Sequence, residues 1–264
     1  MIFINPQWQG SGFTDEIRTG TETLKQYYIN FNEVVEVPLS KKKLSIVENI
    51  KCFHPIIEQT ISFKKLITDI HPVKISTIGG DCGIEIIPIS YLNKIYQNDI
   101  IIIWIDAHAD LNTPESSPSK TFHGMPLRTL LGEGNRQIID LLFSTITAEQ
   151  ICFVGVRDLD ESESNYISGK EIKTLSNCNF SDIQAAINGF NKIYIHLDLD
   201  VLDREEFEFT MFPTKGGIKI KDVTQLIKDL KVHYDVVGIC ITESTASKLE
   251  LLKPIWPILE QIEL

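Results

Sequence analysis

The sequence predicts an α/β protein in which a mainly parallel sheet lies between two layers of helices. Two observations lead to this prediction. Short apolar runs alternate with amphipathic stretches along the 264 residues, and that order is typical of parallel strands joined by helices. Several runs are continuously apolar rather than alternating, which indicates strands that are covered on both faces.

Seven apolar runs are the expected strands. They are IFIN (2–5), EVVEVPL (33–39), VKISTIGG (73–80), DIIIIWID (99–106), ICFVGVR (151–157), KIYIHLDLD (192–200) and DVVGICITE (235–243). Amphipathic stretches such as 43–70 and 218–230 are the expected helices. A last helix is expected over 247–264, interrupted near Pro254 and Pro257. Without repeats or linker-like segments, one domain over 1–264 is the simplest organisation.

Bulk composition narrows the classes of partner and the cellular location. The formal net charge is −11, which argues against nucleic acid or an anionic membrane surface as the main partner. No apolar run reaches the length of a membrane span, and MIFINPQWQG does not resemble a secretory signal. The five cysteines show no paired spacing, so we expect free thiols in a reducing, cytoplasmic compartment. Whether the protein is a monomer or a homo-oligomer is left open.

Polar side chains follow four of the expected strands. Ligands of open α/β sheets bind beyond the carboxyl ends of the strands, so these side chains are the candidates for chemistry. The two longest segments without periodicity, 106–122 and 201–217, also start there, and long irregular loops in compact domains are usually functional or disordered. The side chains at the strand ends are Asp81, Cys82, Asp106, His108, Asp110, Asp198, Asp200 and Glu243.

The segment DAHAD (106–110) indicates a metal site. Residues two apart in an extended segment face the same side, so its two aspartates and its histidine can converge. The same holds for Asp198 and Asp200. Crowded carboxylates repel one another unless cations lie among them, and carboxylates with an imidazole suit Mn²⁺. This many ligands could hold two ions about 3.5–4 Å apart. The alternative is a set of solvated strand ends or helix caps.

These motifs resemble those of the arginase–agmatinase (ureohydrolase) superfamily. The superfamily patterns GGDH, DAHxD and SxDxDxxDP read here as GGDCG (79–83), DAHAD (106–110) and HLDLDVLDR (196–204). The resemblance extends from about Gly79 to Glu243 and is weaker in the N-terminal third. It implies a three-layer αβα sandwich with a central, mainly parallel sheet of eight strands and a dimanganese site at the strand ends.

The resemblance also implies which residues bind the two Mn²⁺ ions, with Asp106 and Asp198 at the bridging positions. Cys82 is a departure, because most of the superfamily has histidine there. A thiolate is a softer, charged ligand, so Zn²⁺ or Fe²⁺ becomes possible. Alternatively, Cys82 is an ordinary small buried residue beside a half-occupied site. The implied ligands are Cys82, Asp106, His108, Asp110, Asp198 and Asp200.

A cysteine at this position resembles one branch of the superfamily, the N-hydroxy-L-arginine amidinohydrolases of D-cycloserine biosynthesis. That branch makes hydroxyurea and L-ornithine. We therefore expect a hydrolase that acts on the guanidino group of an arginine-type amino acid, with N-hydroxy-L-arginine as the favoured substrate. Plain arginase is the first alternative, ahead of agmatinase, guanidinobutyrase and formimidoylglutamase. A metal-poor, non-catalytic binding protein is the alternative from another class.

The loops LNTPESSPSKTFHGMP (111–126) and VGVRDLDESE (154–163) resemble arginases more closely than agmatinases. By position, Asn112 and Ser119, with Ser117 nearby, match residues that contact the substrate α-carboxylate. Asp160 and Glu163 match residues that receive its α-ammonium group. Neutral donors suit a carboxylate, and carboxylates suit an ammonium. Their plainer interpretation is capping of turns and of the next helix.

Three residues match catalytic positions of the superfamily. Glu243 is implied to pair with the substrate guanidinium, Asp110 to pass a proton to the leaving amine, and His123 to relay protons with solvent. Two departures concern the pocket. Arg204 stands where the superfamily pattern has proline, and Phe212 stands where arginases carry a threonine that approaches the substrate. We expect the phenylalanine to change the pocket wall.

Overall fold

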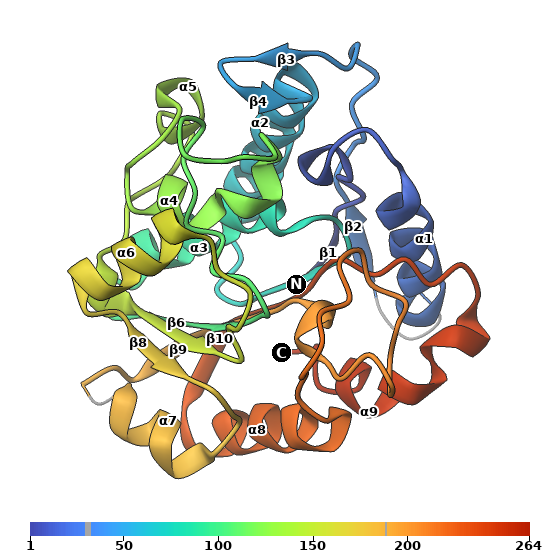
Figure 1. Cartoon of the computed structure of the whole chain (residues 1–264). Coiled ribbons are helices and arrows are strands. Elements are labelled where there is room, and N and C mark those ends of the chain that lie inside the picture. Colours follow the sequence, from blue (N-terminus) through green and yellow to red (C-terminus); the bar gives the residue numbers. More distant parts are fainter. Residues whose placement is uncertain (30–32, 188) are drawn as a thin grey trace.

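A parallel sheet runs through the middle of the molecule (Figure 1). The computed structural model describes residues 1–29, 33–187 and 189–264. Within this part of the chain, the main sheet has eight strands in the order β2-β1-β5-β10-β9-β6-β7-β8, and all neighbouring strands are parallel. The strands are β1 (Ile2–Ile4), β2 (Val34–Glu36), β5 (Ile75–Ile78), β6 (Ile101–Ile105), β7 (Ile151–Val154), β8 (Lys173–Leu175), β9 (Lys192–Leu197) and β10 (Asp235–Ile241).

Helices cover both faces of this sheet, which confirms the predicted three-layer α/β fold. Residues of α1, α7, α8 and α9 pack on one face, and residues of α2 to α6 pack on the other. No helix among the described residues is long and apolar enough to cross a membrane. The helices are α1 (Glu16–Tyr28), α2 (Phe53–Ile70), α3 (Ile86–Ile95), α4 (Pro126–Leu130), α5 (Arg136–Ile139), α6 (Glu161–Lys170), α7 (Phe180–Ala186), α8 (Ile220–His233) and α9 (Trp256–Leu259).

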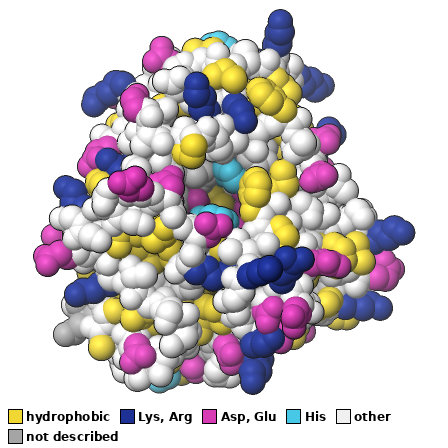
Figure 2. Space-filling view, in the orientation of Figure 1, with side chains coloured by type: hydrophobic (Ala, Val, Ile, Leu, Met, Phe, Trp, Pro, Cys, Tyr) yellow, Lys and Arg dark blue, Asp and Glu magenta, His cyan; other side chains and the backbone are white. Residues whose placement is uncertain are grey.

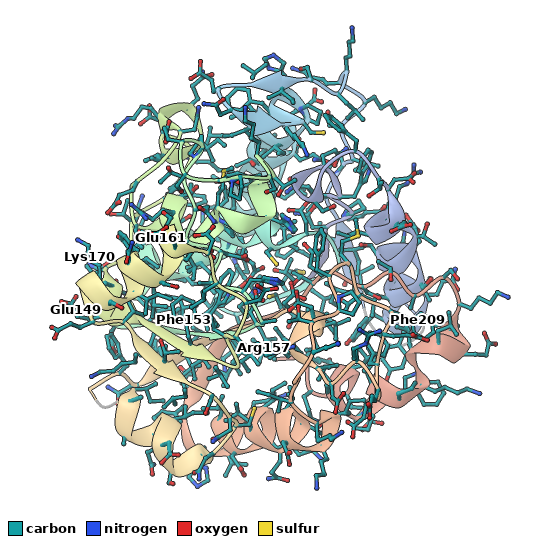
Figure 3. All side chains as sticks on the ribbon, in the orientation of Figure 1. Glu149, Phe153, Arg157, Glu161, Lys170 and Phe209 are labelled. Carbon is teal, nitrogen blue, oxygen red and sulfur yellow. The ribbon has the colours of Figure 1, made fainter. Side chains whose placement is uncertain are left out.

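Strand β6 shows why the continuously apolar runs form central strands. Its alternate residues enter the two separate cores, Ile103 on one face and Trp104 on the other. Both faces are buried, so no polar position remains within the strand. Figure 3 shows Phe153 of β7 in this interior and the charged Glu149 and Lys170 at the periphery.

All seven expected runs contain strands, but two local predictions were incomplete or wrong. The eighth strand, β8, is a short, partly exposed edge strand with the sequence KTL, so it lacks an apolar signal. The stretch 43–70 is helical only from Phe53. Before it, β3 (Ile46–Val47) and β4 (Ile50–Lys51) form an antiparallel hairpin. Glu48 and Asn49 have φ of 52° and 57°, as a two-residue hairpin turn requires.

The C-terminal prediction agrees with the structure. Residues Leu249–Ile255 form a 3₁₀ helix that contains Pro254, and α9 follows with Pro257 in its first turn. Proline removes a backbone donor and crowds the preceding turn, so one long α-helix cannot form here.

Helix α1 packs so closely against the segment after β10 that Gly20 has no room for a side chain. An added Cβ would lie 1.8 Å from the carbonyl oxygen of Ser244. We expect Gly20→Ala to lower the free energy of unfolding by about 1–3 kcal/mol or more through overpacking. Chemical denaturation measures this change in the free energy of unfolding.

The matched control is Gly169→Ala in α6, where nothing lies within 4 Å of the added Cβ. Alanine is expected to stabilise the helix there by up to about 1 kcal/mol. Equal stability of the two variants would contradict this account of the packing.

Candidate metal and active site

The predicted site residues come together at the carboxyl ends of four neighbouring strands. Strands β5, β10, β9 and β6 are adjacent in the sheet, and each is followed directly by part of the site. Cys82 begins the 3₁₀ helix Cys82–Glu85 after β5, and Glu243 follows β10. Because the strands are parallel, residues far apart in sequence meet at one edge, as expected for open α/β sheets.

Asp106, His108 and Asp200 form one group that could hold a metal ion. Their nearest ligand atoms all lie within 4.8 Å of one another. His108 Nδ1 is 2.9 Å from Asp200 Oδ2 and 3.6 Å from Asp106 Oδ1. Asp106 is held in place by Trp104 Nε1, which donates to its Oδ2 at 3.0 Å. The expected convergence of DAHAD and of the second motif is therefore present.

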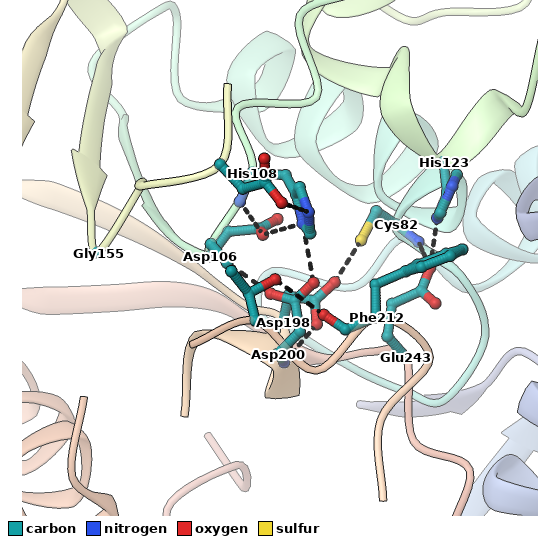
Figure 4. A network of polar contacts seen from close by, with 12 residues as sticks. Cys82, Asp106, His108, His123, Gly155, Asp198, Asp200, Phe212 and Glu243 are labelled. Carbon is teal, nitrogen blue, oxygen red and sulfur yellow. Dashed lines mark hydrogen bonds and ion pairs between the residues drawn. The ribbon is translucent and has the colours of Figure 1, made fainter. Parts of the chain in front are cut away.

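Cys82 faces the same cluster from the 3₁₀ helix that follows β5 (Figure 4). Its Sγ lies 3.0 Å from Asp198 Oδ2, and the thiol, Asp198 and Glu243 form a second group of close ligand atoms. A further group joins Cys82 with Asp106, Asp110 and His196. Cys82 is thus buried among carboxylates rather than among apolar side chains alone, which supports its interpretation as a ligand.

The electrostatics of the cluster favour a bound cation. Burial and the charge of Asp106 raise the pKa of Asp200 to about 6. Burial and the neighbouring carboxylates also raise the pKa values of Asp110 and Asp198. Burial and the Asp198 charge raise the pKa of Cys82. Crowding therefore opposes ionisation of these groups, and a divalent ion would relieve it.

Two site residues adopt left-handed backbone conformations. Asp110 has φ of 53° and Glu243 has φ of 64°, which is unfavourable for side chains with a Cβ. The backbone around Glu243 is fixed by bonds from its N–H to Gly80 O and from Met211 N to its carbonyl. Each residue also has a buried carboxylate oxygen, Asp110 Oδ2 and Glu243 Oε2, with no hydrogen-bond partner among the described residues. Strain and unpaired oxygens at the same residues are typical of a functional site.

A cavity of about 400 Å³ opens above the cluster. Figure 2 shows it as a hollow with acidic and histidine side chains at its bottom. Asp106 is buried and does not line the cavity, whereas every other residue proposed for the site contributes to the lining. These are Cys82, His108, Asp110, Asn112, Ser117, Ser119, His123, Asp160, Glu163, Asp198, Asp200 and Glu243.

His123 and Phe212 meet at the cavity wall. His123 Nδ1 is 3.1 Å from Glu243 Oε1. The ring of Phe212 lies 5.3 Å from the His123 ring, centroid to centroid, and 44% of the Phe212 residue is exposed. The expectation that Phe212 forms part of the pocket wall agrees with this position.

The residues expected to bind the amino-acid end line the cavity, but several already have partners within the protein. Asp160 caps α6 by accepting from Glu163 N at 2.9 Å, and its other oxygen accepts from Asn112 Nδ2 at 2.7 Å. Glu163 accepts from Leu111 N and Asp160 N. The capping interpretation is therefore correct for Asp160 and Glu163, and their role toward an ammonium group stays a prediction. The Ser117 and Ser119 hydroxyls face each other at 3.3 Å.

The sequence analysis missed two contributors to the site, Arg157 and Asp158. Arg157, labelled in Figure 3, donates to the carbonyls of Asp200 and Thr214, so it fastens the 201–217 loop to the end of the Asp198–Asp200 segment. Arg157 lies within the segment VGVRDLDESE, but the sequence alone does not reveal which carbonyl groups a single arginine contacts. Asp81, which the sequence analysis did name as a strand-end residue, accepts from Gly10 N and Gly83 N and so fixes the turn that presents Cys82. Asp158 lines the cavity rim.

The metal-free protein is expected to be more stable at pH 5 than at pH 7.5. The folded-state pKa of Asp200, about 6, is above its ordinary value of 3.8. The folded state therefore binds this proton more tightly, and that contribution to stability is lost as the pH rises from about 4 through 6. The raised pKa values of Asp110 and Asp198 also make the metal-free folded state more stable at low pH than at high pH. Thermal melts should show a larger stabilisation by Mn²⁺ at pH 7.5 than at pH 5. A pH-independent metal effect would contradict this.

The fold and the cluster place the protein among α/β proteins with a strand-end site suited to divalent ions. The family model described as "Arginase family" matches residues 11–247. The arginase of Staphylococcus aureus (strain MRSA252) is 34% identical over 177 residues, which cover 63% of this chain and 58% of that protein. The arginase of Bacillus subtilis (strain 168) is 28% identical over 214 residues, covering 76% and 72%.

The solved structure of Entamoeba histolytica arginase in complex with L-ornithine has the same fold, with a TM-score of 0.87 at 23% identity. The match covers 99% of this chain and 97% of that one. The sequence match to the staphylococcal relative is shorter and spans a little over half of that protein's length. The chain belongs to the arginase family, since the family model covers most of its residues.

Proposed function

We propose that this protein is a dinuclear metal hydrolase that cleaves the guanidino group of an L-arginine-type amino acid. One observation carries the proposal: a single cavity joins a metal-binding cluster at its floor to a buried carboxylate, Glu243, whose Oε2 is unpaired. A guanidinium is a planar, forked cation and pairs well with such a carboxylate. The membership in a family of hydrolases that act on C–N bonds of linear amidines supports the same reaction class.

The residues present fit two divalent ions. Cys82, Asp106, Asp110 and Asp198 would hold one ion, and Asp106, His108, Asp198 and Asp200 would hold the other. When bound, the ions would supply a water molecule activated at neutral pH and would stabilise developing negative charge. Mn²⁺ is the ion implied by the family, and the Cys82 thiolate makes Zn²⁺ or Fe²⁺ possible.

Glu243 would orient the substrate. Its Oε1 lies near Cys82 N and His123 Nδ1, at 3.3 and 3.1 Å, so the carboxylate is fixed and Oε2 is left for the guanidinium. Orientation of a reactant in this way can supply a large part of the rate acceleration.

Asp110 and His123 would move protons. Asp110 Oδ2 is buried and unpaired, so it could accept a proton and pass it to the departing amine. His123 lies between the cavity and solvent, with 17% of its side chain exposed. Burial alone would lower the pKa of His123, but the neighbouring Glu243 outweighs this effect and the pKa is raised. This favours a protonated imidazole that can donate its proton.

N-hydroxy-L-arginine is the proposed preferred substrate, with hydroxyurea and L-ornithine as products. Cys82 supports this choice, because it stands in the cluster where most of the superfamily has histidine. Plain arginase activity, giving urea and L-ornithine, is the second candidate, supported by the naming of the sequence relatives as arginases.

Product release from three substrates tests this proposal. Metal-loaded protein should release L-ornithine from N-hydroxy-L-arginine faster than from L-arginine, and it should act poorly on agmatine, which lacks the α-carboxylate. Equal or faster turnover of L-arginine would support plain arginase. Preference for agmatine would contradict the assigned amino-acid end of the cavity. Inertness toward all three, with two ions bound, would contradict the proposed reaction.

A further inference from the structure

His196 of β9 is a fully buried histidine that the proposed mechanism does not use. Its ring stacks on the indole of Trp104, with 3.5 Å between centroids and 13° between planes. No part of the residue is exposed. The stacking and the surrounding strands fix the plane of the imidazole, so the direction of each ring nitrogen is defined.

Nδ1 of His196 faces away from the cavity, toward Glu85 and Cys240. It lies 3.7 Å from Glu85 Oε2 and 3.1 Å from Cys240 Sγ. Glu85 is also fully buried, and neither of its carboxylate oxygens has a hydrogen-bond partner among the described residues. An N–H on Nδ1 would face this carboxylate, which leaves the lone pair of His196 on Nε2.

Nε2 of His196 points into the metal-binding cluster. It lies 3.5 Å from Asp106 Oδ2, and His196 forms with Cys82, Asp106 and Asp110 a group of residues whose ligand atoms lie within 4.8 Å of one another. Nε2 is buried and has no hydrogen-bond partner among the described residues. A metal-bound histidine usually donates its other ring N–H to a carboxylate, and Glu85 is in the position for that role.

We infer that His196 is an additional metal ligand, which binds through Nε2 the ion held by Cys82, Asp106 and Asp110. This inference rests on the dinuclear centre of the proposed function and adds a ligand to it. The set then combines a thiolate, an imidazole and carboxylates, which suits a borderline-soft divalent ion such as Zn²⁺ or Fe²⁺ better than Mn²⁺.

Two of this chain's departures from the superfamily patterns, at positions 82 and 196, become one exchange under this inference. Position 82 has histidine in the pattern GGDH, and position 196 has serine in the pattern SxDxDxxDP. This chain has Cys82 and His196 instead. Their ligand atoms face the same cluster, so the imidazole missing from the turn after β5 is supplied from the end of β9.

The competing role is positional, with a proton on Nε2 that is donated to Asp106. Substitution of His196 would weaken metal binding in both roles, because a residue that only positions a metal ligand also typically contributes about 10–100-fold to affinity. Metal affinity alone therefore does not separate the two roles. A spectroscopic signature of imidazole bound to the metal does.

The test uses ¹⁵N-histidine-labelled protein loaded with Co²⁺. Imidazoles bound directly to Co²⁺ give N–H proton signals with large paramagnetic shifts. We expect two such signals, one from His108 and one from His196. The His108 side chain is 29% exposed, so its N–H should exchange quickly in D₂O, whereas the N–H of the buried His196 should persist. This count needs no variant.

Two variants assign the signals. His196→Gln should remove the persistent signal, and the matched control His54→Gln, at an exposed position on α2, should remove none. With two Co²⁺ ions per chain, a single shifted imidazole signal would overturn the inference and leave the proposed function standing. Failure of the full chain to bind Co²⁺, Mn²⁺ or Zn²⁺ would overturn both.

Discussion

The variant Asp198→Asn is expected to lose nearly all activity and at least part of its metal. Asp198 Oδ2 faces Cys82, and its Oδ1 accepts from Asp200 N at 2.8 Å. Asparagine keeps an acceptor for that backbone bond but removes a charged oxygen from the cluster. Because loss of an outer partner already costs about 10–100-fold, we expect a fall in kcat/KM of roughly 1,000-fold or more. Ornithine release and metal content per chain measure the two effects.

The same variant should leave the fold intact. Removal of one of several crowded, buried carboxylates relieves repulsion in the metal-free protein, so its Tm should equal or exceed that of the wild type. The matched control is Asp203→Asn, five residues along the same loop, where the ion pair with Lys219 is partly exposed and should contribute little. Full metal content and activity in Asp198→Asn would rule out Asp198 as a ligand.

The variant Glu243→Gln is expected to keep its metal and lose substrate binding. Glutamine retains the acceptor for Cys82 N but loses the charge that would pair with a guanidinium. Removal of one partner of a buried charge pair costs about 2–5 kcal/mol, or roughly 30- to 5,000-fold in kcat/KM. Steady-state kinetics and metal analysis of the same preparation separate the two functions.

A surface glutamate provides the control for this change. Glu250→Gln alters an exposed position near the C-terminus and should leave the kinetics unchanged. A small change in kcat/KM for Glu243→Gln, with the metal retained, would exclude Glu243 as the guanidinium partner. Loss of metal in this variant would instead assign Glu243 to the metal centre, next to Cys82 and Asp198.

The strand order of the sheet could not be read from the sequence, although seven of the eight strands could. A strand such as β6 can be recognised from its continuous apolar run, because both of its faces are buried. The edge strand β8 has no such run, since its residues are partly exposed. The hairpin before α2 was missed for a different reason. Its turn depends on the left-handed conformations of Glu48 and Asn49, and an apolar pattern does not reveal backbone conformation.

The site was predictable to the extent that its residues follow strands directly. Asp106, His108, Asp198 and Asp200 could be placed together from spacing and parallel pairing alone. His196 could not, because a histidine inside an apolar strand looks like a core residue. Its orientation toward the cluster depends on the stacking with Trp104 and on Glu85, which only the three-dimensional structure brings together.

Titration of the metal-free protein with Mn²⁺, followed by L-ornithine release from N-hydroxy-L-arginine and L-arginine, tests the central proposal most directly. We predict no activity without added ion and a rise that saturates at two ions per chain. Activity that does not depend on a divalent ion, or two bound ions without release of ornithine from either substrate, would contradict the proposal.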